Sequence, residues 1–190
     1  MAFGPTFPSV LAAARAGGDS AWAAIHDELA PALLGYLRAR GAAEPEDVLA
    51  ETLLQVVRDL PRFDGGEGEF RAWAFRIARN RLLDERRRRA RRPVDPHADP
   101  GEPGPPAPDA AEEALGRIDA ERVRSVLAQL SADQRDVLLL RLFGDLTVEQ
   151  VAELSGRSAG AVKQLQRRGL AAARRALERG AVTLSSLGAL

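Results

Sequence analysis

A proline-rich stretch in the middle of this 190-residue chain most constrains how the chain can fold. Seven prolines fall between Pro93 and Pro108, separated by small and acidic residues, and such a composition cannot build a packed core. We therefore expect two small domains, residues 6–92 and 116–180, joined by a flexible linker at 93–115 and followed by a tail at 181–190.

The linker region is also strongly acidic. From Asp95 to Glu121 eight acidic residues face only Arg117, a net charge of −7. This charge either serves solubility, or makes an acidic strand that occupies a nucleic-acid channel until it is displaced.

Helical periodicity fills both halves of the chain and predicts an all-α fold. In the first half the expected helices cover residues 6–17, 19–40, 44–60 and 70–92. Gly17 ends the first helix and Asp19 or Ser20 caps the second. Pro31 removes a backbone hydrogen bond within the second helix, so we expect a kink or break near Ala30.

The helix expected over residues 44–60 has two contrasting sides. Its apolar side is made of Val48, Leu49, Leu53, Val56, Val57 and Leu60. The other side is polar and mainly acidic, and it includes Asp47, Glu51, Gln55 and Arg58. This polar side is either plain solvent surface or a docking face for a basic partner, and the sequence alone favours solvent surface.

The helix over residues 70–92 carries the densest positive charge in the chain. Eleven arginines between Arg62 and Arg92 face five acidic residues, a local net charge of +6 in a chain of zero net charge, and such clustering favours a polyanionic partner. Asn80 lies one heptad beyond Trp73 and so on nearly the same side. An amide and an aromatic ring beside a phosphate-binding face suit single-stranded bases. Trp73 also belongs to the apolar stripe of this helix, and the sequence favours a core position for it over that of a platform for a base.

The last third of the chain has the cap and turn residues of a helix-turn-helix motif. Ser131 and Thr147 each begin a capping-box pattern, and the first of these helices is expected to end at Gly144. After it we expect a short helix at 147–154, a tight turn at 155–157 and a longer helix from Ser158 to about residue 178. In that last helix the outward residues are Lys163, Gln164, Arg167 and Arg168, types that match base edges and phosphates.

Several functional classes find no support in the sequence. The chain has no cysteine, which excludes disulfides, thiolate zinc sites and a cysteine nucleophile. We find no phosphate-binding loop and no nucleophile paired with a base, so we expect neither an enzyme nor a cofactor or metal. No export signal or long apolar run is present, which predicts a cytoplasmic protein without direct membrane insertion.

Two stretches resemble the bacterial RNA polymerase sigma factors, specifically the small extracytoplasmic-function (ECF) group of the sigma-70 family. Residues 47–60, followed by Arg62-Phe-Asp and by FRAWAFRIARNRLLD from Phe70, are similar to conserved region 2. Leu130 onward through the last helix is similar to region 4. The resemblance covers nearly the whole chain and implies a subunit that binds core polymerase, recognises promoter elements and melts DNA.

The resemblance also implies a role for particular residues. Those implied to bind and melt the −10 promoter element and to hold a flipped base are Phe63, Asp64, Arg71, Trp73, Arg76, Arg79, Asn80, Asp84 and Arg87. Those implied to read the −35 element are Arg157, Ser158, Lys163, Gln164, Arg167 and Arg168. The polar side of the 44–60 helix, with Asp47, Glu51, Gln55 and Arg58, would dock on the clamp helices of the polymerase's largest subunit.

Further partners follow from the same resemblance. They are promoter DNA in duplex and single-stranded form, the flap of the second-largest polymerase subunit, and an anti-sigma protein. The acidic linker would thread toward the active-site cleft of the polymerase. The alternative function is a stand-alone helix-turn-helix regulator that binds duplex DNA, which would leave the arginine-rich helix and the acidic linker without a task.

Overall fold

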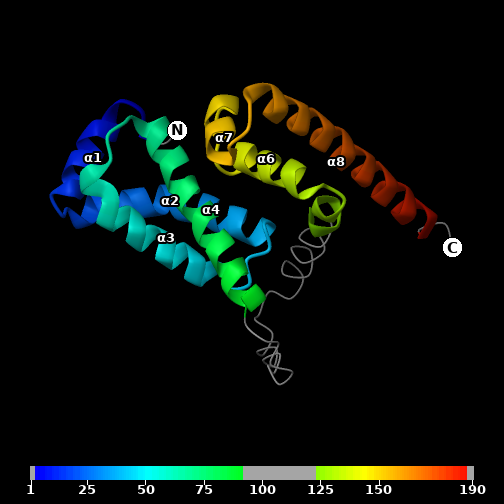
Figure 1. Cartoon of the computed structure of the whole chain (residues 1–190), viewed down its shortest axis with the longest axis horizontal. Coiled ribbons are helices and arrows are strands. Elements are labelled where there is room, and N and C mark those ends of the chain that lie inside the picture. Colours follow the sequence, from blue (N-terminus) through cyan, green and yellow to red (C-terminus); the bar gives the residue numbers. More distant parts are fainter. Residues whose placement is uncertain (1–2, 92–122, 188–190) are drawn as a thin grey trace, which may run out of the picture.

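The computed structural model describes residues 3–91 and 123–187, with side chains described as far as residue 179 (Figure 1). The described residues form helices and turns without a strand, which confirms the all-α prediction. The linker predicted at 93–115, residues 116–122 and the last three residues of the tail lie outside the described residues. No helix in the described part of the chain is long and apolar enough to cross a membrane.

The first half is a helical bundle. Its elements are the 3-10 turn Gly4–Thr6, α1 Phe7–Arg15, α2 Asp19–Ala39, α3 Pro45–Asp59, the 3-10 turn Leu60–Arg62 and α4 Glu67–Arg91. α3 packs against both α2 and α4, and α1 covers the start of α2 (Figure 1). Each helix turns one side inward, and in α3 the buried residues of that side are Val48, Thr52 and Val56.

The second half is a three-helix unit preceded by a short helical stretch at 123–128. It consists of α6 Ala132–Leu142, α7 Val148–Ser155 and α8 Ala159–Leu187. Ser131 and Thr147 both form complete capping boxes, so the predicted starts of α6 and α7 are confirmed. α8 continues well past the predicted end near residue 178 and includes part of what we expected to be a separate tail.

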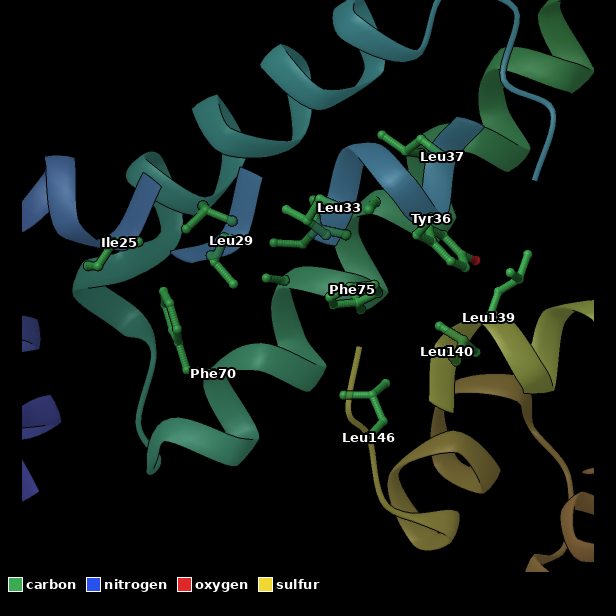
Figure 2. Close-up of a cluster of buried hydrophobic side chains, with 14 of the residues drawn as sticks. Ile25, Leu29, Leu33, Tyr36, Leu37, Phe70, Phe75, Leu139, Leu140 and Leu146 are labelled. Atoms are coloured by element: carbon green, nitrogen blue, oxygen red, sulfur yellow. The ribbon is translucent and has the colours of Figure 1, made fainter. Parts of the chain in front are cut away.

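A hydrophobic cluster of described residues runs through both halves. Tyr36 of α2 and Phe75 of α4 are fully buried and lie beside Leu139, Leu140 and Leu146 from the second half (Figure 2). The rings of Tyr36 and Phe75 meet edge to face with centroids 5.5 Å apart. The two halves therefore pack against each other, with α6 against α2 and α7 against α4.

For α2 the predicted caps and the predicted break at Pro31 were wrong, while the alternative of a kink near Ala30 stays a prediction. Pro31 does not break the helix, because Leu29 and Leu33 on either side of it are buried and their packing outweighs one lost hydrogen bond. Pro31 itself is exposed. Neither Asp19 nor Ser20 caps the helix: the N-cap is Gly18, because Gly17 adopts φ +83° and turns the chain at once into α2.

α3 does not bury the whole of its apolar side. Val57 is 47% exposed, although it belongs to the apolar side in the sequence pattern. The buried stripe of α3 is narrow, and Val57 lies at its edge, on the same side as Leu54, which is 63% exposed. α3 therefore presents apolar as well as polar side chains to solvent.

Candidate nucleic-acid interface

A hollow of about 460 Å³ lies where the loop before α4 meets the first turns of that helix. Phe63 from the loop stacks on Trp73 of α4, with ring centroids 5.1 Å apart and planes inclined by 29°. Phe63 also meets Phe70, whose ring is buried, edge to face at 5.3 Å. The buried aromatic thus fixes the loop, and Trp73 and Phe63 form one aromatic wall of the hollow.

Polar side chains complete the rim of this hollow. Asp64, Arg76 and Asn80 line it together with the aromatic wall, and all three are exposed. The prediction that Asn80 lies on the same side as Trp73 is thus confirmed. Six further residues of the lining were not among the predicted site residues. Three come from the loop and α4 and three from α7: Arg62, Glu69, Ala72, Gln150, Glu153 and Leu154.

The remaining residues predicted to contact the −10 element lie outside the hollow. Arg71 donates two hydrogen bonds to Glu28 Oε1, at 3.0 and 3.1 Å, and its side chain is only 17% exposed. Arg71 therefore ties α4 to α2 rather than facing solvent. Asp84 and Arg87 form an exposed pair one turn apart, at 3.2 Å, near the basic end of α4.

The polar side of α3 divides into two groups. Glu51 and Gln55 face α4, where Arg81 donates to Gln55 Oε1 at 2.7 and 3.0 Å and lies 3.6 Å from Glu51. Asp47 and Arg58 are exposed. The exposed apolar residues Leu54 and Val57 lie on α3 as well, so the solvent face of this helix is more apolar than the sequence pattern indicated.

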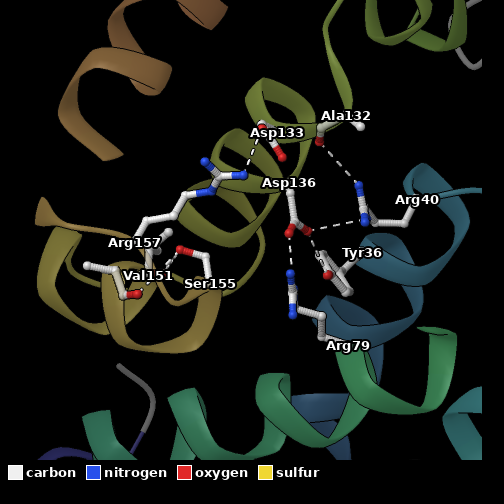
Figure 3. Close-up of polar contacts among 10 residues, drawn as sticks. Tyr36, Arg40, Arg79, Ala132, Asp133, Asp136, Val151, Ser155 and Arg157 are labelled. Carbon is white, nitrogen blue, oxygen red and sulfur yellow. Dashed lines mark hydrogen bonds and ion pairs between the residues drawn. The ribbon is translucent and has the colours of Figure 1, made fainter. Parts of the chain in front are cut away.

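The helix-turn-helix geometry of α7 and α8 is complete. Gly156 takes the left-handed conformation, with φ +67°, and ends α7, as a tight turn requires. Ser158 Oγ accepts a hydrogen bond from the Ala161 amide, which confirms it as the cap of α8. Arg157 in the turn pairs with Asp133 at 2.7 Å (Figure 3).

The outward face of α8 matches the prediction. Lys163, Gln164, Arg167 and Arg168 are all exposed. On the opposite side Val162 is buried, and Gly169 lies so close to Leu138 that an added Cβ would come within 2.9 Å of Leu138 Cδ1. This close approach fixes α8 against α6 and turns its basic face to solvent.

A buried carboxylate between the two halves was missed by the sequence analysis. Asp136 Oδ2 accepts a hydrogen bond from Arg79 Nε at 3.0 Å, and Asp136 Oδ1 accepts one from Tyr36 Oη at 3.1 Å (Figure 3). Arg40 Nε lies 3.3 Å from Oδ1 as an ion pair, without hydrogen-bond geometry. Arg40 Nη1 reaches the Ala132 carbonyl at 3.5 Å.

The side chains of this cluster are mostly buried, and their burial shifts the pKa values of two neighbouring groups. The side chains of Arg40 and Asp136 are 8% and 10% exposed, and that of Arg79 is 21% exposed. Burial, reinforced by the adjacent Asp136 carboxylate, raises the pKa of Tyr36 well above its ordinary value. Burial also lowers the pKa of Arg86, and repulsion from the positive charge of Arg40 lowers it further. Arg86 donates a hydrogen bond to the Arg40 carbonyl.

The described residues offer no group of three or more His, Cys, Asp or Glu side chains that could hold a metal ion. What they do offer is an aromatic hollow bordered by arginine and amide groups, and a separate basic helix face. The first suits unpaired bases and their phosphates, and the second suits the major groove of duplex DNA.

Family models match both halves of the chain. Residues 25–92 match the model described as Sigma-70 region 2, and residues 126–175 match the model described as Sigma-70, region 4. The "ECF RNA polymerase sigma factor ShbA" of Streptomyces griseus is 34% identical over 160 residues, which is 77% of this chain and 84% of that protein. The "ECF RNA polymerase sigma factor SigD" of Mycobacterium tuberculosis is 32% identical over 173 residues, 88% of this chain and 82% of the relative.

Solved structures give the same picture of the fold. CnrH in complex with the cytosolic domain of CnrY aligns with a TM-score of 0.66 and 25% identity, over 91% of this chain and 97% of that one. The sigma factor RpoE of Bartonella quintana, in complex with the anti-sigma factor NepR, aligns with a TM-score of 0.60 and 25% identity. That alignment covers 78% of this chain and 91% of the RpoE chain.

Proposed function

The chain belongs to the ECF group of sigma-70 family RNA polymerase sigma factors, and we propose which of its surfaces perform the steps of promoter recognition. As a promoter-specificity subunit it directs core polymerase to promoters and starts transcription there. We divide it, as the sequence suggests, into a −10 and core-binding domain at 6–92 and a −35-binding domain at 116–180.

The single observation that carries the −10 assignment is the hollow formed by Phe63, Trp73, Arg76 and Asn80. A base turned out of the duplex needs a flat partner for its ring and a hydrogen-bonding partner for its edge. Trp73 with Phe63 supplies the first and Asn80, with two donors and one acceptor group, supplies the second. Arg76, which is 53% exposed, is placed for the neighbouring phosphate.

We also propose different roles for the other predicted −10 residues, according to their contacts. Asp64 on the rim remains a candidate for contact with a base edge. Arg87 at the basic end of α4 is 68% exposed and suits a phosphate further along the strand, and Asp84 beside it would orient its guanidinium. Arg71 is assigned a positioning role instead, because its contact with Glu28 fixes the angle between α4 and α2.

We assign −35 recognition to the exposed start of α8. Lys163, Gln164, Arg167 and Arg168 form one basic face that fits the major groove, where lysine and arginine match guanine and glutamine matches adenine. Arg157 and Ser158 lie in and just after the turn, next to the expected path of the DNA backbone. Arg167 donates a hydrogen bond to Gln164 at 3.0 Å, so the two would act as a pair.

We place core-polymerase docking on the solvent face of α3. Asp47 and Arg58 supply charge at its two ends, and Leu54 and Val57 supply exposed apolar area between them. Glu51 and Gln55 border this face while holding Arg81 of α4. An apolar centre with a charged rim is the usual composition of a protein interface, and the partner would be the clamp helices of the largest subunit.

Other partners complete the proposal. The −35 domain would contact the flap of the second-largest polymerase subunit, and an anti-sigma protein is a further expected partner, since RpoE of Bartonella quintana was solved with one. Working with polymerase places the chain in the cytoplasm. We assign it no catalytic step, because the free energy of binding unpaired bases can itself drive the separation of the two DNA strands. This role needs no cofactor.

The test is run-off transcription from a library of genomic fragments with bacterial core polymerase, with and without this protein. The proposal predicts discrete new start sites that are absent with core polymerase alone. Sequences upstream of those starts should share two motifs at a fixed spacing, one for each DNA-binding surface. Specific binding to duplex DNA without any new start site would instead favour the stand-alone regulator.

A further inference from the structure

Helix α1 and the turn before it lie beside the loop that precedes α4 (Figure 1). We call residues 3–15 the α1 segment. It precedes residues 25–92, which match region 2, and none of the residues assigned to promoter recognition above belongs to it. The α1 segment nevertheless holds the loop and the helix that form the hollow at Trp73, through three kinds of contact.

The first contact is a carboxylate bound by two backbone amides. Glu67, the first residue of α4, accepts a hydrogen bond from the Phe3 amide at Oε1, at 3.1 Å, and one from the Gly4 amide at Oε2, at 2.9 Å. Hydrogen bonds to a carboxylate are stronger than those to a neutral acceptor, and here both oxygens are fixed in direction. Glu67 therefore ties the first turn of α4 to a turn that lies 63 residues earlier in the chain.

The second contact is a series of aromatic rings. Phe3 meets Phe7 with ring centroids 6.2 Å apart, and Phe7, which is buried, meets Phe70 at 5.5 Å. Phe70 in turn contacts both Phe63, at 5.3 Å, and Trp73, at 5.7 Å. The aromatic wall of the hollow thus rests on rings that the α1 segment contributes, and such ring pairs stabilise the packing beyond the effect of burial alone.

The third contact is made by Arg15, in the last turn of α1. Arg15 Nε donates a hydrogen bond to the Leu60 carbonyl at 3.3 Å, and Arg15 Nη2 donates one to the Phe63 carbonyl. The Phe63 amide also donates to the Leu60 carbonyl, at 3.1 Å, so the guanidinium closes over both ends of the 3-10 turn Leu60–Arg62. Arg15 does not line the hollow, and it acts there only through the backbone that carries the Phe63 ring.

The loop needs such outside contacts because of its composition. Asp64, Gly65 and Gly66 follow Phe63, and glycine loses more conformational freedom on ordering than any other residue. If the loop became ordered only when a base bound, that lost freedom would weaken the binding of the base. A loop that is already held in place avoids this loss, so the α1 segment preorganises the aromatic wall.

We infer that Arg15 and Glu67 are positioning residues of the −10 site. Arg15 fixes the backbone of Phe63, and Glu67 fixes the start of the helix that carries Trp73. The two rings therefore already stand in the stacked arrangement that an unpaired base needs. The identity of this ligand rests on the proposed function. The placement of the two rings does not, because it concerns only contacts within the first half of the chain.

The placement of the rings is tested by the fluorescence of Trp73 in the full-length chain. The chain has two tryptophans, and Trp22→Phe leaves Trp73 as the single emitter. On this background Arg15→Met keeps a long side chain and the helix propensity of arginine but removes both donors. We expect acrylamide to quench Trp73 more strongly in Arg15→Met, because the Phe63 ring no longer shields one of its faces.

Three further variants separate this effect from a general loss of packing. Arg38→Met is the matched control, since Arg38 pairs with Glu46 on an exposed surface of α2 and α3, and its quenching should equal that of the parent. Arg15→Lys keeps the charge and can still donate to either carbonyl, so it should restore most of the parent value. Glu67→Gln keeps one acceptor oxygen of two, so it should change the quenching in the same direction as Arg15→Met but by less.

The consequence for DNA is tested with core polymerase loaded with each full-length variant. Two probes share one promoter duplex found by run-off transcription, and one of them also carries the unpaired non-template strand of the −10 element. The ratio of their Kd values isolates the contribution of the unpaired bases, since core and −35 contacts are common to both probes. If the loop holds its competent arrangement in only about a tenth of the Arg15→Met molecules, this ratio falls about tenfold. Affinity for the duplex probe should stay at the parent value.

The outcomes separate the inference from the proposed function. Equal quenching and equal Kd ratios in Arg15→Met and Arg38→Met would overturn the inference. So would a loss of affinity for the duplex probe as large as the loss for the longer probe, because that pattern indicates general destabilisation. If the parent protein itself gained no affinity from the unpaired strand, the proposed −10 function would be wrong, whereas stronger quenching in Arg15→Met would still support the positioning of Phe63.

Discussion

Removing the charge of Asp136 should change how Tyr36 titrates, and this can be measured directly because Tyr36 is the single tyrosine of the chain. Its hydroxyl is 3.1 Å from Asp136 Oδ1 and its side chain is fully buried. Ionisation would place two negative charges side by side, at a cost of about 5 kcal/mol for an effective dielectric constant of about 20. Arg40 and Arg79 offset part of this cost.

The sign of the effect follows from the direction of the pKa shift. Burial and Asp136 raise the pKa of Tyr36 in the folded chain above that of an unfolded tyrosine, which is about 10. The folded state thus binds the phenolic proton more tightly. Stability linked to this group is fully present below pH about 10 and is lost as the pH rises toward the folded pKa.

The assay is the ultraviolet absorbance of tyrosinate during an alkaline titration. In the parent chain ionisation should begin only above pH about 10, together with loss of the packing between the two halves. In Asp136→Asn it should begin at least about one pH unit lower, since a neutral amide does not repel the phenolate. Asp145→Asn, which removes an exposed carboxylate, should titrate like the parent, and Tyr36→Phe should abolish the signal. Equal midpoints in the parent and Asp136→Asn would refute the contact.

Three further substitutions test individual surfaces. Arg167→Ala should weaken −35 binding by about tenfold, through loss of one base or phosphate contact, with core-polymerase affinity unchanged in a pull-down; loss of core binding would contradict the assignment. Leu54→Glu should weaken core binding at constant helicity, since this side chain is 63% exposed, and an unaltered affinity would move the docking face elsewhere. Glu28→Gln should cost about 2 kcal/mol in urea unfolding by weakening the hold on Arg71; no change would show that this pair contributes nothing.

Local signals in the sequence sufficed for much of the fold. Helix caps and tight turns depend on residues within about four positions of each other, so they can be predicted from the sequence. This holds for the capping boxes at Ser131 and Thr147 and for the turn at Gly156. The common side of Trp73 and Asn80 follows from helical geometry alone. The break expected at Pro31 does not occur, because the one hydrogen bond that proline removes stabilises α2 less than the burial of Leu29 and Leu33 does.

The parts that could not be predicted depend on contacts between distant segments. Arg71 sits in a basic helix and its sequence context resembles that of Arg76, yet Glu28, 43 residues away, turns it inward. Asp136 looks like an ordinary acid in an amphipathic helix, and its partners Arg79 and Tyr36 are 57 and 100 residues distant. The periodicity of a helix does not indicate which faces of the two halves meet. The contact of Asp136 with Arg79 and Tyr36 could therefore be found only in the structure.

The central claim, that the hollow at Trp73 holds unpaired promoter DNA, is tested most directly by permanganate footprinting of polymerase loaded with this protein on a promoter found by run-off transcription. The parent chain should make thymines near the −10 element reactive. Asn80→Ala, which alters an exposed rim residue, should keep protection of the −35 element but lose most of that reactivity. Equal thymine reactivity in the parent and in Asn80→Ala would contradict the assignment of Asn80 and of the hollow it borders.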